Sequence, residues 1–452
     1  MVESKIFREY DIRGVWGKDL TLEAVRAIGR AYAHYLKQMI GKDKLKVSIG
    51  FDARTSSPAI RDALVEELTA SGLDVVDIGM CPTPLQYFSI YHLELDGGVM
   101  ITGSHNPPEF NGLKLSVGKE TIYGEKIQEI RKLVEKGASI KGAGKSTKHD
   151  ILRDYVSEIK KRFGSLEGLK VVVDAGNGVG GMVGPEIMRA LGASVTELFC
   201  NPDGNFPNHH PDPVVLKNLT HLIAKVKETG AHIGVGYDGD ADRIGVVDEK
   251  GNAVWGDSLM IIYSRDILKD NKGAAVIGEV KCSQTLYDDI AKHGGDPVMW
   301  KTGHSLIKKK MKETGALLAG EMSGHIFFAD RYFGYDDAVY ASLRMLEILK
   351  TKGAPYSVSA LLADVPNMVS TPEIRMDCPD ETKFGIAEKM KEAFKDYPVV
   401  TIDGVRINFP EGWGLIRASN TQPALVLRFE AKDDASLKKI KDTVETQLAK
   451  FI

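Results

Sequence analysis

Apolar and polar residues follow one another along this chain in a rhythm that predicts strands alternating with helices. Short runs rich in β-branched residues, at 44–52 and 74–79, are separated by longer segments whose apolar residues recur every three or four positions, at 58–72 and 83–93. Such alternation is typical of parallel βαβ units with right-handed crossovers. Two more strands are expected in this first unit, at 97–102 and 112–117.

The same rhythm returns twice after a glycine- and lysine-rich stretch at 136–150, which predicts a link to a second unit. In that second unit, a strand and a glycine turn at 170–181 lead into a helix that ends near Leu191. Further strands of the second unit are expected at 193–199 and 232–238, with a hairpin at 244–254. The third unit has expected strands at 274–280, 297–300 and 316–322, and helices at 257–268, 283–295, 303–315 and 336–353.

Beyond Pro366 the pattern changes to strands with two separated helices, expected at 384–397 and 435–451. This arrangement is typical of a small α+β domain. The predicted fold class is therefore α/β, with three similar βαβ-type domains and a smaller C-terminal α+β domain. The expected boundaries are 1–150, 151–253, 254–366 and 367–452.

Length and charge narrow the classes of function. A chain of 452 residues is too long for one compact core, which agrees with several domains. Its 59 basic and 62 acidic residues give a formal net charge of −3. This balance argues against a nucleic-acid or anionic-membrane partner, so any phosphate-binding site must be a local cluster.

Cysteine usage and the first residues predict a cytoplasmic location. Cys81, Cys200, Cys282 and Cys378 are widely scattered, as expected for reduced thiols rather than a disulfide framework. The N-terminal segment is charged from its start and lacks the apolar core of a signal peptide. No stretch approaches the ~18 apolar residues that a spanning helix needs.

The first candidate for chemistry is Ser104, in the segment Thr-Gly-Ser-His-Asn-Pro-Pro at 102–108. The segment follows a predicted strand, and open α/β sheets bind ligands at the carboxyl ends of their strands. Gly103 permits a tight turn, and the two prolines stiffen the chain beyond it. Ser104 is thus a plausible nucleophile, although a polar turn whose serine caps backbone groups would look similar.

The second candidate is a group of carboxylates, Asp238, Asp240 and Asp242. In an extended loop, side chains spaced by two residues point the same way, and three converging carboxylates repel one another unless a cation lies among them. Hard oxygen ligands suit Mg²⁺. A calcium EF-hand is disfavoured because Arg243 stands where that loop requires glycine. The alternative is a charged hairpin turn.

Two further loops are rich in groups that bind sugars or phosphates. Glu321 and Ser323, in Gly-Glu-Met-Ser-Gly-His, suit recognition of adjacent sugar hydroxyls. The segment Arg-Ala-Ser-Asn-Thr-Gln-Pro at 417–423 offers a guanidinium, two hydroxyls and an amide as a cradle for phosphate. Taken alone, either segment could equally be an ordinary polar turn.

Two other patterns point to different functions. Gly176, Gly178 and Gly181 fit the weak G-x-G-x-x-G pattern of dinucleotide-binding oxidoreductases, but nothing nearby offers hydride chemistry. Lys308, Lys309 and Lys310 form a charge run that we interpret as a solvated helix face rather than a nucleic-acid patch.

Six motifs in register resemble the α-D-phosphohexomutase superfamily over nearly the whole chain. They are YDIRG at 10–14, ITGSHNPPEFNGLK at 101–114, DGDADR at 238–243, WKTGHS at 300–305, GEMSGH at 320–325 and RASNTQP at 417–423. YDIRG, the glycine before Ser104, and Met322 are similar to the phosphomannomutase/phosphoglucomutase branch. Phosphoglucosamine mutases, the alternative within the superfamily, typically show TDGIRG, alanine before the serine, and glutamine in the GEMSGH motif.

The resemblance implies four domains around a central active-site cleft and a role for each matching residue. Those implied in catalysis are Ser104 as phosphoryl carrier, Lys114 or His304 as acid or base, and Arg13 and Arg243 facing the phosphoserine. Those implied in substrate binding are Tyr10, Lys281, Glu321, Ser323, His325, Arg417, Ser419, Asn420 and Thr421. The implied Mg²⁺ ligands are Asp238, Asp240, Asp242 and one oxygen of phosphorylated Ser104.

The implied reaction interconverts hexose 1-phosphate and hexose 6-phosphate of mannose or glucose. It passes through a hexose 1,6-bisphosphate that turns around in the cleft and also serves as activator. Two rival functions fit Ser104 less well. A Mg²⁺-dependent phosphatase would usually employ an aspartate as its nucleophile, and a protein that only binds sugar phosphates needs no nucleophile at all. The sequence leaves open the preferred hexose, the oligomeric state and which of Lys114 and His304 takes the proton.

Overall fold

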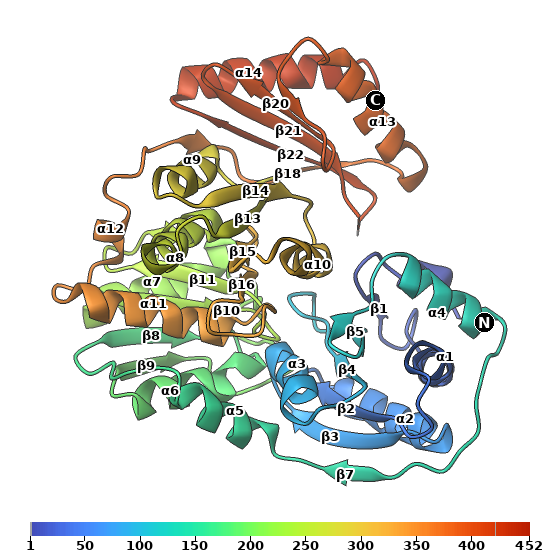
Figure 1. Cartoon of the computed structure of the whole chain (residues 1–452). Helices are drawn as coiled ribbons and strands as arrows, with labels where there is room; N and C mark the ends of the chain where they lie inside the picture. Colours follow the sequence, from blue (N-terminus) through green and yellow to red (C-terminus); the bar gives the residue numbers. More distant parts are fainter. Residues whose placement is uncertain (1, 421) are drawn as a thin grey trace.

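The computed structural model describes residues 2–420 and 422–452, which fold around four β-sheets. Figure 1 shows the first and last of the four sheets, in blue and red, at opposite ends of an arc whose middle holds the other two. The fold class is confirmed, with three α/β domains followed by a smaller antiparallel domain. Within the described residues, no helix combines the length and apolar character needed to cross a membrane.

The first sheet has the strand order β1-β5-β4-β2-β3-β7, with β6 paired to β5. Its strands are β1 (Ile12–Val15), β2 (Lys46–Phe51), β3 (Asp74–Met80), β4 (Gly97–Ile101), β5 (Phe110–Val117), β6 (Glu120–Thr121) and β7 (Ser146–Lys148). Its helices are α1 (Leu22–Ile40), α2 (Ser57–Ala70), α3 (Thr83–His92) and α4 (Glu125–Glu135).

The expected parallel pairing of βαβ units is found for β2, β3 and β4 but not for β5. β2 pairs in parallel with β3 and β4, but β5 runs antiparallel to both β4 and β1. The loop from β4 to β5 is too short to contain a crossover helix, so β5 must return in the opposite direction. The predicted link at 136–150 also contains a strand, since β7 adds to the sheet edge beside β3.

The second sheet has the order β12-β11-β10-β8-β9 and the third has the order β14-β13-β15-β16. The second contains β8 (Lys170–Asp174), β9 (Ser194–Leu198), β10 (Ile233–Tyr237), β11 (Ile244–Asp248) and β12 (Ala253–Val254), with helices α5 (Ile151–Lys160), α6 (Gly184–Ala190) and α7 (Thr220–Thr229). The third contains β13 (Ala275–Glu279), β14 (Asp296–Trp300), β15 (Leu318–Gly320) and β16 (Ile326–Phe328), with α8 (Gly256–Asp270), α9 (Gln284–Lys292), α10 (His304–Thr314), α11 (Ala338–Lys352) and α12 (Val358–Leu361).

The last sheet is antiparallel throughout its described pairs and has the order β17-β22-β21-β20-β19, with β18 also paired to β22. Its elements are β17 (Val369–Ser370), β18 (Ile374–Asp377), β19 (Val399–Val400), β20 (Val405–Phe409), β21 (Gly412–Ala418), β22 (Ala424–Ala431), α13 (Asp380–Ala393) and α14 (Asp434–Leu448). Short 3₁₀ turns lie at Ser4–Ile6, Val179–Met182 and Leu216–Leu219.

The hydrophobic cores explain how the domains are held together. One continuous core joins the second and third domains and includes Val235 and Leu343, both fully buried. It extends to Phe88 on α3 of the first domain. The last domain has a core of its own, around Ile416 and Leu427. The second and third domains therefore share one hydrophobic core, and the loops at the ends of their strands are positioned on it.

Candidate active site

A cavity of about 1000 Å³ lies where loops from all four sheets meet. Its lining includes Ser104, Arg243, Glu321 and Arg417, one from each domain. Of the residues expected in the site, it also includes Tyr10, Arg13, Lys114, Asp242, Lys281, His304, Ser323, His325, Ser419 and Asn420. Asp238 and Asp240 lie fully buried behind this lining, and Thr421 lies outside the described residues.

Ser104 stands in a strained turn directly after β4. Its φ of 48° lies in the left-handed region, where non-glycine residues are uncommon, and its side chain is only 3% exposed. The backbone amide of Ser104 donates to Oγ1 of Thr102 at 2.8 Å. Strain of this kind persists only where surrounding contacts fix the conformation.

Arg54, which the sequence analysis missed, supplies those contacts. The residue is 1% exposed, and its guanidinium donates to the backbone carbonyls of Ser104 at 2.9 Å, Asn106 at 2.6 Å and Phe110 at 2.9 Å. Its Nε pairs with the buried carboxylate of Asp52 at 3.1 Å. One buried cation therefore holds the whole serine loop from behind.

We expect Arg54→Met to destabilise the first domain strongly. The change leaves the Asp52 carboxylate buried without its counter-ion, which costs about 3–5 kcal/mol in comparable cases. Urea unfolding of the variant would measure the loss. Arg26→Met is the matched control and should change the midpoint far less, because Arg26 is partly exposed and its partner Glu67 keeps a second cation, Arg30. Equal effects of the two variants would contradict the role given to Arg54.

The hydroxyl of Ser104 contacts residues of two different loops. Oγ donates to Oδ2 of Asp238 at 2.9 Å and lies 3.1 Å from Nδ1 of His105. Burial, with the nearby Arg243 and Arg13, lowers the pKa of His105 well below its usual range, so its ring is neutral. The predicted nucleophile and the predicted carboxylate loop are therefore brought together, although they lie far apart in the sequence.

The three aspartates converge as the spacing predicted. Asp238, Asp240 and Asp242 are fully buried, with one carboxylate oxygen from each within 4.8 Å of the others. Burial and the two neighbouring carboxylates raise the pKa of Asp238 well above its usual range. Oδ1 of Asp240 and Oδ1 of Asp242 accept no hydrogen bond from any residue that the structure describes. Unpartnered buried carboxylate oxygens beside Ser104 fit a divalent cation with oxygen ligands.

Lys114 on β5 partly balances this charge. Its ammonium, 3% exposed, donates to Oδ2 of Asp240 at 2.9 Å and also to Oδ2 of Asp242. Burial opposes the charge, but the two carboxylates outweigh it and raise the pKa of Lys114 well above its usual range. Oδ2 of Asp240 also accepts from Thr83 at 2.6 Å, so Asp240 and Asp242 each present one engaged and one open oxygen.

Arg243 is oriented by a histidine of the third domain. Its Nε donates to Nε2 of His325 at 2.9 Å, which requires the proton of a neutral His325 to be on Nδ1. That nitrogen lies 3.0 Å from the buried carboxylate of Asp336. Asp336 is a second residue that sequence analysis missed. The neighbouring His304 is also buried, and burial with Lys308 lowers its pKa well below its usual range.

The predicted sugar loop contains a hydrogen bond between its own side chains. Oε2 of Glu321 accepts from the hydroxyl of Ser323 at 2.8 Å, and Oε1 accepts from the backbone amide of Gly303 at 2.7 Å. Gly303 has a φ of 131°, and a Cβ there would lie 2.5 Å from the ring of Tyr10. The loop before α10 therefore needs glycine to bring the first and third domains together beside Glu321.

The predicted phosphate cradle faces the same cavity from the last domain. Arg417 pairs with Asp403 at 3.0 Å, and Asn420 donates to the hydroxyl of Tyr10 at 2.8 Å. Lys281 is buried and pairs with Glu373 at 3.0 Å. Cationic and amide groups of the third and fourth domains thus line the cavity, together with the Tyr10 hydroxyl of the first domain.

The glycine pattern around Gly178 and the lysine run at 308–310 both contribute to packing in the structure. A Cβ on Gly178 would lie 2.7 Å from the carbonyl oxygen of Gly239, so this glycine permits close packing against the aspartate loop. The interpretation of the lysine run as a solvated face is wrong for Lys308, whose side chain is 13% exposed and lies 3.3 Å from Asp336. It agrees with Lys309, which is 64% exposed.

Comparison with known proteins agrees with this arrangement along the whole chain. Models of phosphoglucomutase/phosphomannomutase alpha/beta/alpha domains I, II and III match residues 4–141, 153–251 and 255–368, and the model of the C-terminal domain matches 373–447.

Individual relatives cover nearly the full length. A phosphomannomutase/phosphoglucomutase of Pseudomonas aeruginosa is 46% identical over 449 residues, covering 98% of this chain and 96% of its own. A phosphoglucomutase of Neisseria meningitidis is 45% identical over 443 residues, covering 97% and 95%. The crystal structure of a phosphoglucomutase/phosphomannomutase family protein from Burkholderia thailandensis superposes with a TM-score of 0.93 at 44% identity, covering 99% and 98%. The chain belongs to the phosphoglucomutase/phosphomannomutase family, within the α-D-phosphohexomutase superfamily.

Proposed function

We propose that this phosphohexomutase interconverts the 1-phosphate and 6-phosphate of mannose and of glucose through a phosphorylated Ser104. The observation that carries the proposal is the contact of Ser104 Oγ with Asp238 at 2.9 Å, in a cavity that also holds the cationic cradle around Arg417. The cavity thus combines a nucleophile beside the three aspartates with hydrogen-bond donors around Arg417 that can bind a second phosphate.

The first transfer moves the phosphoryl group from Ser104 to a sugar hydroxyl. The hydroxyl oxygen forms the new bond to phosphorus while the bond to Ser104 Oγ breaks, and the hydroxyl proton passes to a base of the protein. Phosphoserine carries nearly two negative charges, so cations must offset them before the attack. Arg243, which is oriented by His325, and Arg13 both line the cavity and would supply this positive charge.

Asp238, Asp240 and Asp242 would hold Mg²⁺, with an oxygen of the phosphoserine as a further ligand. When bound, the ion would offset charge on the transferring phosphoryl group. The open oxygens of Asp240 and Asp242 support this assignment. Asp238, which contacts Ser104 directly, would also orient the serine oxygen.

His304 is the better candidate for the base. The amine of Lys114 already donates to Asp240 and Asp242. His304 lines the cavity at the start of α10, and burial keeps its ring neutral and able to accept a proton. Lys114 then contributes positive charge rather than proton transfer.

The bisphosphate product would turn around before the second transfer. Its other phosphate must reach Ser104, so the cradle of Arg417, Ser419 and Asn420, with Thr421, has to accept either end of the sugar. A volume of about 1000 Å³ is at the upper end for small-molecule sites and supports such reorientation inside the cavity. Four unpaired cysteines support the expectation that the enzyme works in the reducing cytoplasm.

We expect both sugars to be used. Mannose and glucose differ at the 2-hydroxyl, whereas Glu321 and Ser323 would bind the 3- and 4-hydroxyls that the sugars share. One hydrogen bond more or less is worth about 1 kcal/mol, so the two values of kcat/KM should lie within roughly tenfold of each other. The double name of the Pseudomonas aeruginosa relative agrees with this expectation.

The test is a mutase assay on mannose 1-phosphate, glucose 1-phosphate and glucosamine 1-phosphate, with Mg²⁺ and a trace of hexose 1,6-bisphosphate. Comparable turnover of the first two sugars supports the proposal. Turnover of glucosamine phosphate alone would favour phosphoglucosamine mutase, with the same fold and mechanism. A preference of many thousandfold between mannose and glucose would contradict shared recognition.

A further inference from the structure

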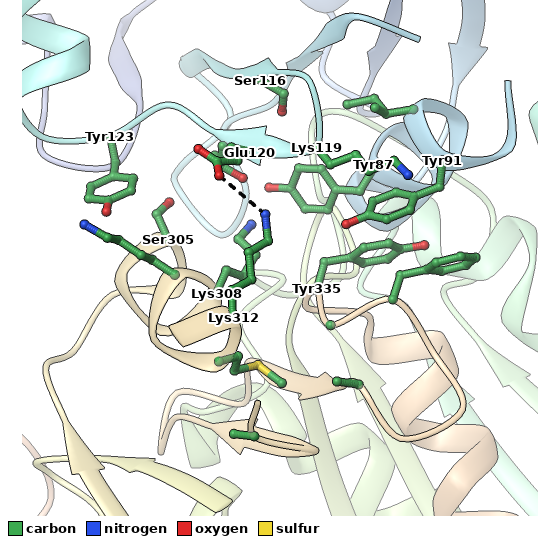
Figure 2. A pocket seen from close by; sticks show the side chains of 18 of the residues that line it. Tyr87, Tyr91, Ser116, Lys119, Glu120, Tyr123, Ser305, Lys308, Lys312 and Tyr335 are labelled. Atoms are coloured by element: carbon green, nitrogen blue, oxygen red, sulfur yellow. Dashed lines mark ion pairs between the residues drawn. The ribbon is translucent and has the colours of Figure 1, made fainter. Parts of the chain in front are cut away.

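A second cavity, of about 300 Å³, lies between the first and third domains, outside the residues of the candidate active site. Figure 2 shows it from close by, with β5, β6 and α3 contributing one wall and α10 the other. Its size is at the lower end for small-molecule sites. The walls come from distant parts of the chain, so a ligand here would touch two domains at once.

Positive charge dominates the lining of this cavity. It contains five lysines, at 119, 126, 308, 309 and 312, and one acidic side chain, Glu120. The carboxylate of Glu120 lies 3.5 Å from the ammonium of Lys126 and 3.7 Å from that of Lys312. Lys119 has no carboxylate partner within 4 Å among the described residues, and its ammonium lies 4.7 Å from the ring centre of Tyr91. In a protein of net charge −3, this concentration of lysines predicts an anionic ligand.

Aromatic rings flank the lysines on both sides. Figure 2 shows Tyr123 at one side of the cavity and Tyr87, Tyr91 and Tyr335 at the other, with Glu120, Lys308 and Lys312 between them. Rings beside ammonium groups provide apolar contact and weak attraction for a flat or ring-shaped group. The cavity therefore combines a charged middle with ring-binding sides.

One polar group points into the cavity without a partner. The side chain of Tyr87 is 4% exposed, and its hydroxyl has no hydrogen-bond partner among the described residues. In Figure 2 this hydroxyl points toward Glu120 and the lysines of α10. A buried hydroxyl left unpaired is costly, and an oxygen of a bound ligand would satisfy it.

We propose that this cavity is a second binding site, for a small phosphorylated molecule that carries a ring. The phosphate would lie among Lys119, Lys308 and Lys312 and accept a hydrogen bond from the Tyr87 hydroxyl. The ring would contact the aromatic side chains. Nucleotides and sugar phosphates share this chemistry, so the probes must separate the two.

Equilibrium dialysis with three radiolabelled probes tests the site: ADP, glucose 1,6-bisphosphate and pyrophosphate. The pocket variant is Lys119→Ala/Lys312→Ala, which spares Lys308 and its contact with Asp336. Arg417→Ala weakens phosphate binding in the active site instead. Lys310→Ala is the matched control, because Lys310 lies on the same helix and outside the cavity lining.

The pocket variant should weaken binding of at least one ring-bearing probe roughly tenfold or more, because two charge-assisted contacts are lost. That binding component should be unchanged in Arg417→Ala and Lys310→Ala, and the pocket variant should keep its mutase activity and thermal stability. ADP alone in the site would identify a nucleotide, and the bisphosphate alone would identify a sugar phosphate.

Tyr87→Phe removes only the hydroxyl and gives a second test that does not depend on the lysines. It should weaken the same binding component several-fold. Binding that no pocket variant changes, or no saturable binding of any probe in the wild type, would overturn the proposal. Equal affinity for pyrophosphate would overturn the requirement for a ring.

Discussion

Ser104→Ala should lower mutase turnover by at least about 10⁴-fold, because removal of a nucleophile that forms the covalent intermediate leaves only binding and charge effects. The variant cannot carry the phosphoryl group on this residue. Mass spectrometry of the wild type after incubation with hexose 1,6-bisphosphate should show one added phosphoryl group on the peptide that contains Ser104. The variant should show none there.

Stability must be checked beside activity. Arg54 holds the loop through the backbone carbonyl of Ser104, which alanine retains, so the substitution should not disturb the loop. Ser264→Ala, which removes another buried hydroxyl, on α8 and outside the cavity lining, is the matched control and should keep full turnover. Full activity of Ser104→Ala would show that the phosphoryl carrier lies elsewhere.

Asp238→Asn should have the second-largest effect. The change keeps the shape of the side chain but removes the charge beside Ser104 Oγ and one expected Mg²⁺ ligand. We expect affinity for Mg²⁺ to fall roughly 100-fold or more, with a comparable loss of turnover at moderate Mg²⁺. Titration calorimetry with Mg²⁺ alone measures the affinity without requiring any catalysis.

A chelator provides the companion experiment. Treatment of the wild type should abolish turnover, and added Mg²⁺ should restore it, whereas Asp238→Asn should recover only at much higher Mg²⁺. Asp270→Asn, at the end of α8, is the control for a general loss of negative charge and should bind Mg²⁺ like the wild type. Unchanged Mg²⁺ affinity in Asp238→Asn would contradict the assignment of the aspartate loop.

The candidate site could be predicted to a large extent because its residues cluster in short loops after strands. Ser104 follows β4, and the aspartates occupy the tight turn between β10 and β11. Local spacing makes such loops candidates, and the six motifs in register separate them from ordinary polar turns. The strand and helix pattern of the first three domains could be predicted for the same reason, since period-two and period-3.6 patterns are local.

Residues that act through distant contacts could not be predicted in this way. Arg54 lies 50 positions before Ser104 and is recognised only when its guanidinium is seen among the carbonyls of the serine loop. Asp336 lies in a sequence typical of the start of a helix, and only the structure shows that its carboxylate lies 3.0 Å from His325. Lys308 belonged to a run that looked solvated, and β7 consists of three polar residues that pair only because β3 offers an edge.

The contact between the serine loop and the aspartate loop has a consequence for synthesis on the ribosome. A Cβ on Gly239 would lie 2.5 Å from the carbonyl oxygen of Ser104, so the two loops meet with no room to spare. Ser104 precedes Asp242 by 138 residues, a stretch that takes on the order of ten seconds to translate. During that interval the serine loop has emerged without its acidic partner. The first domain is therefore synthesised before the aspartates that are proposed to bind metal. The phosphate cradle around Arg417 is synthesised last.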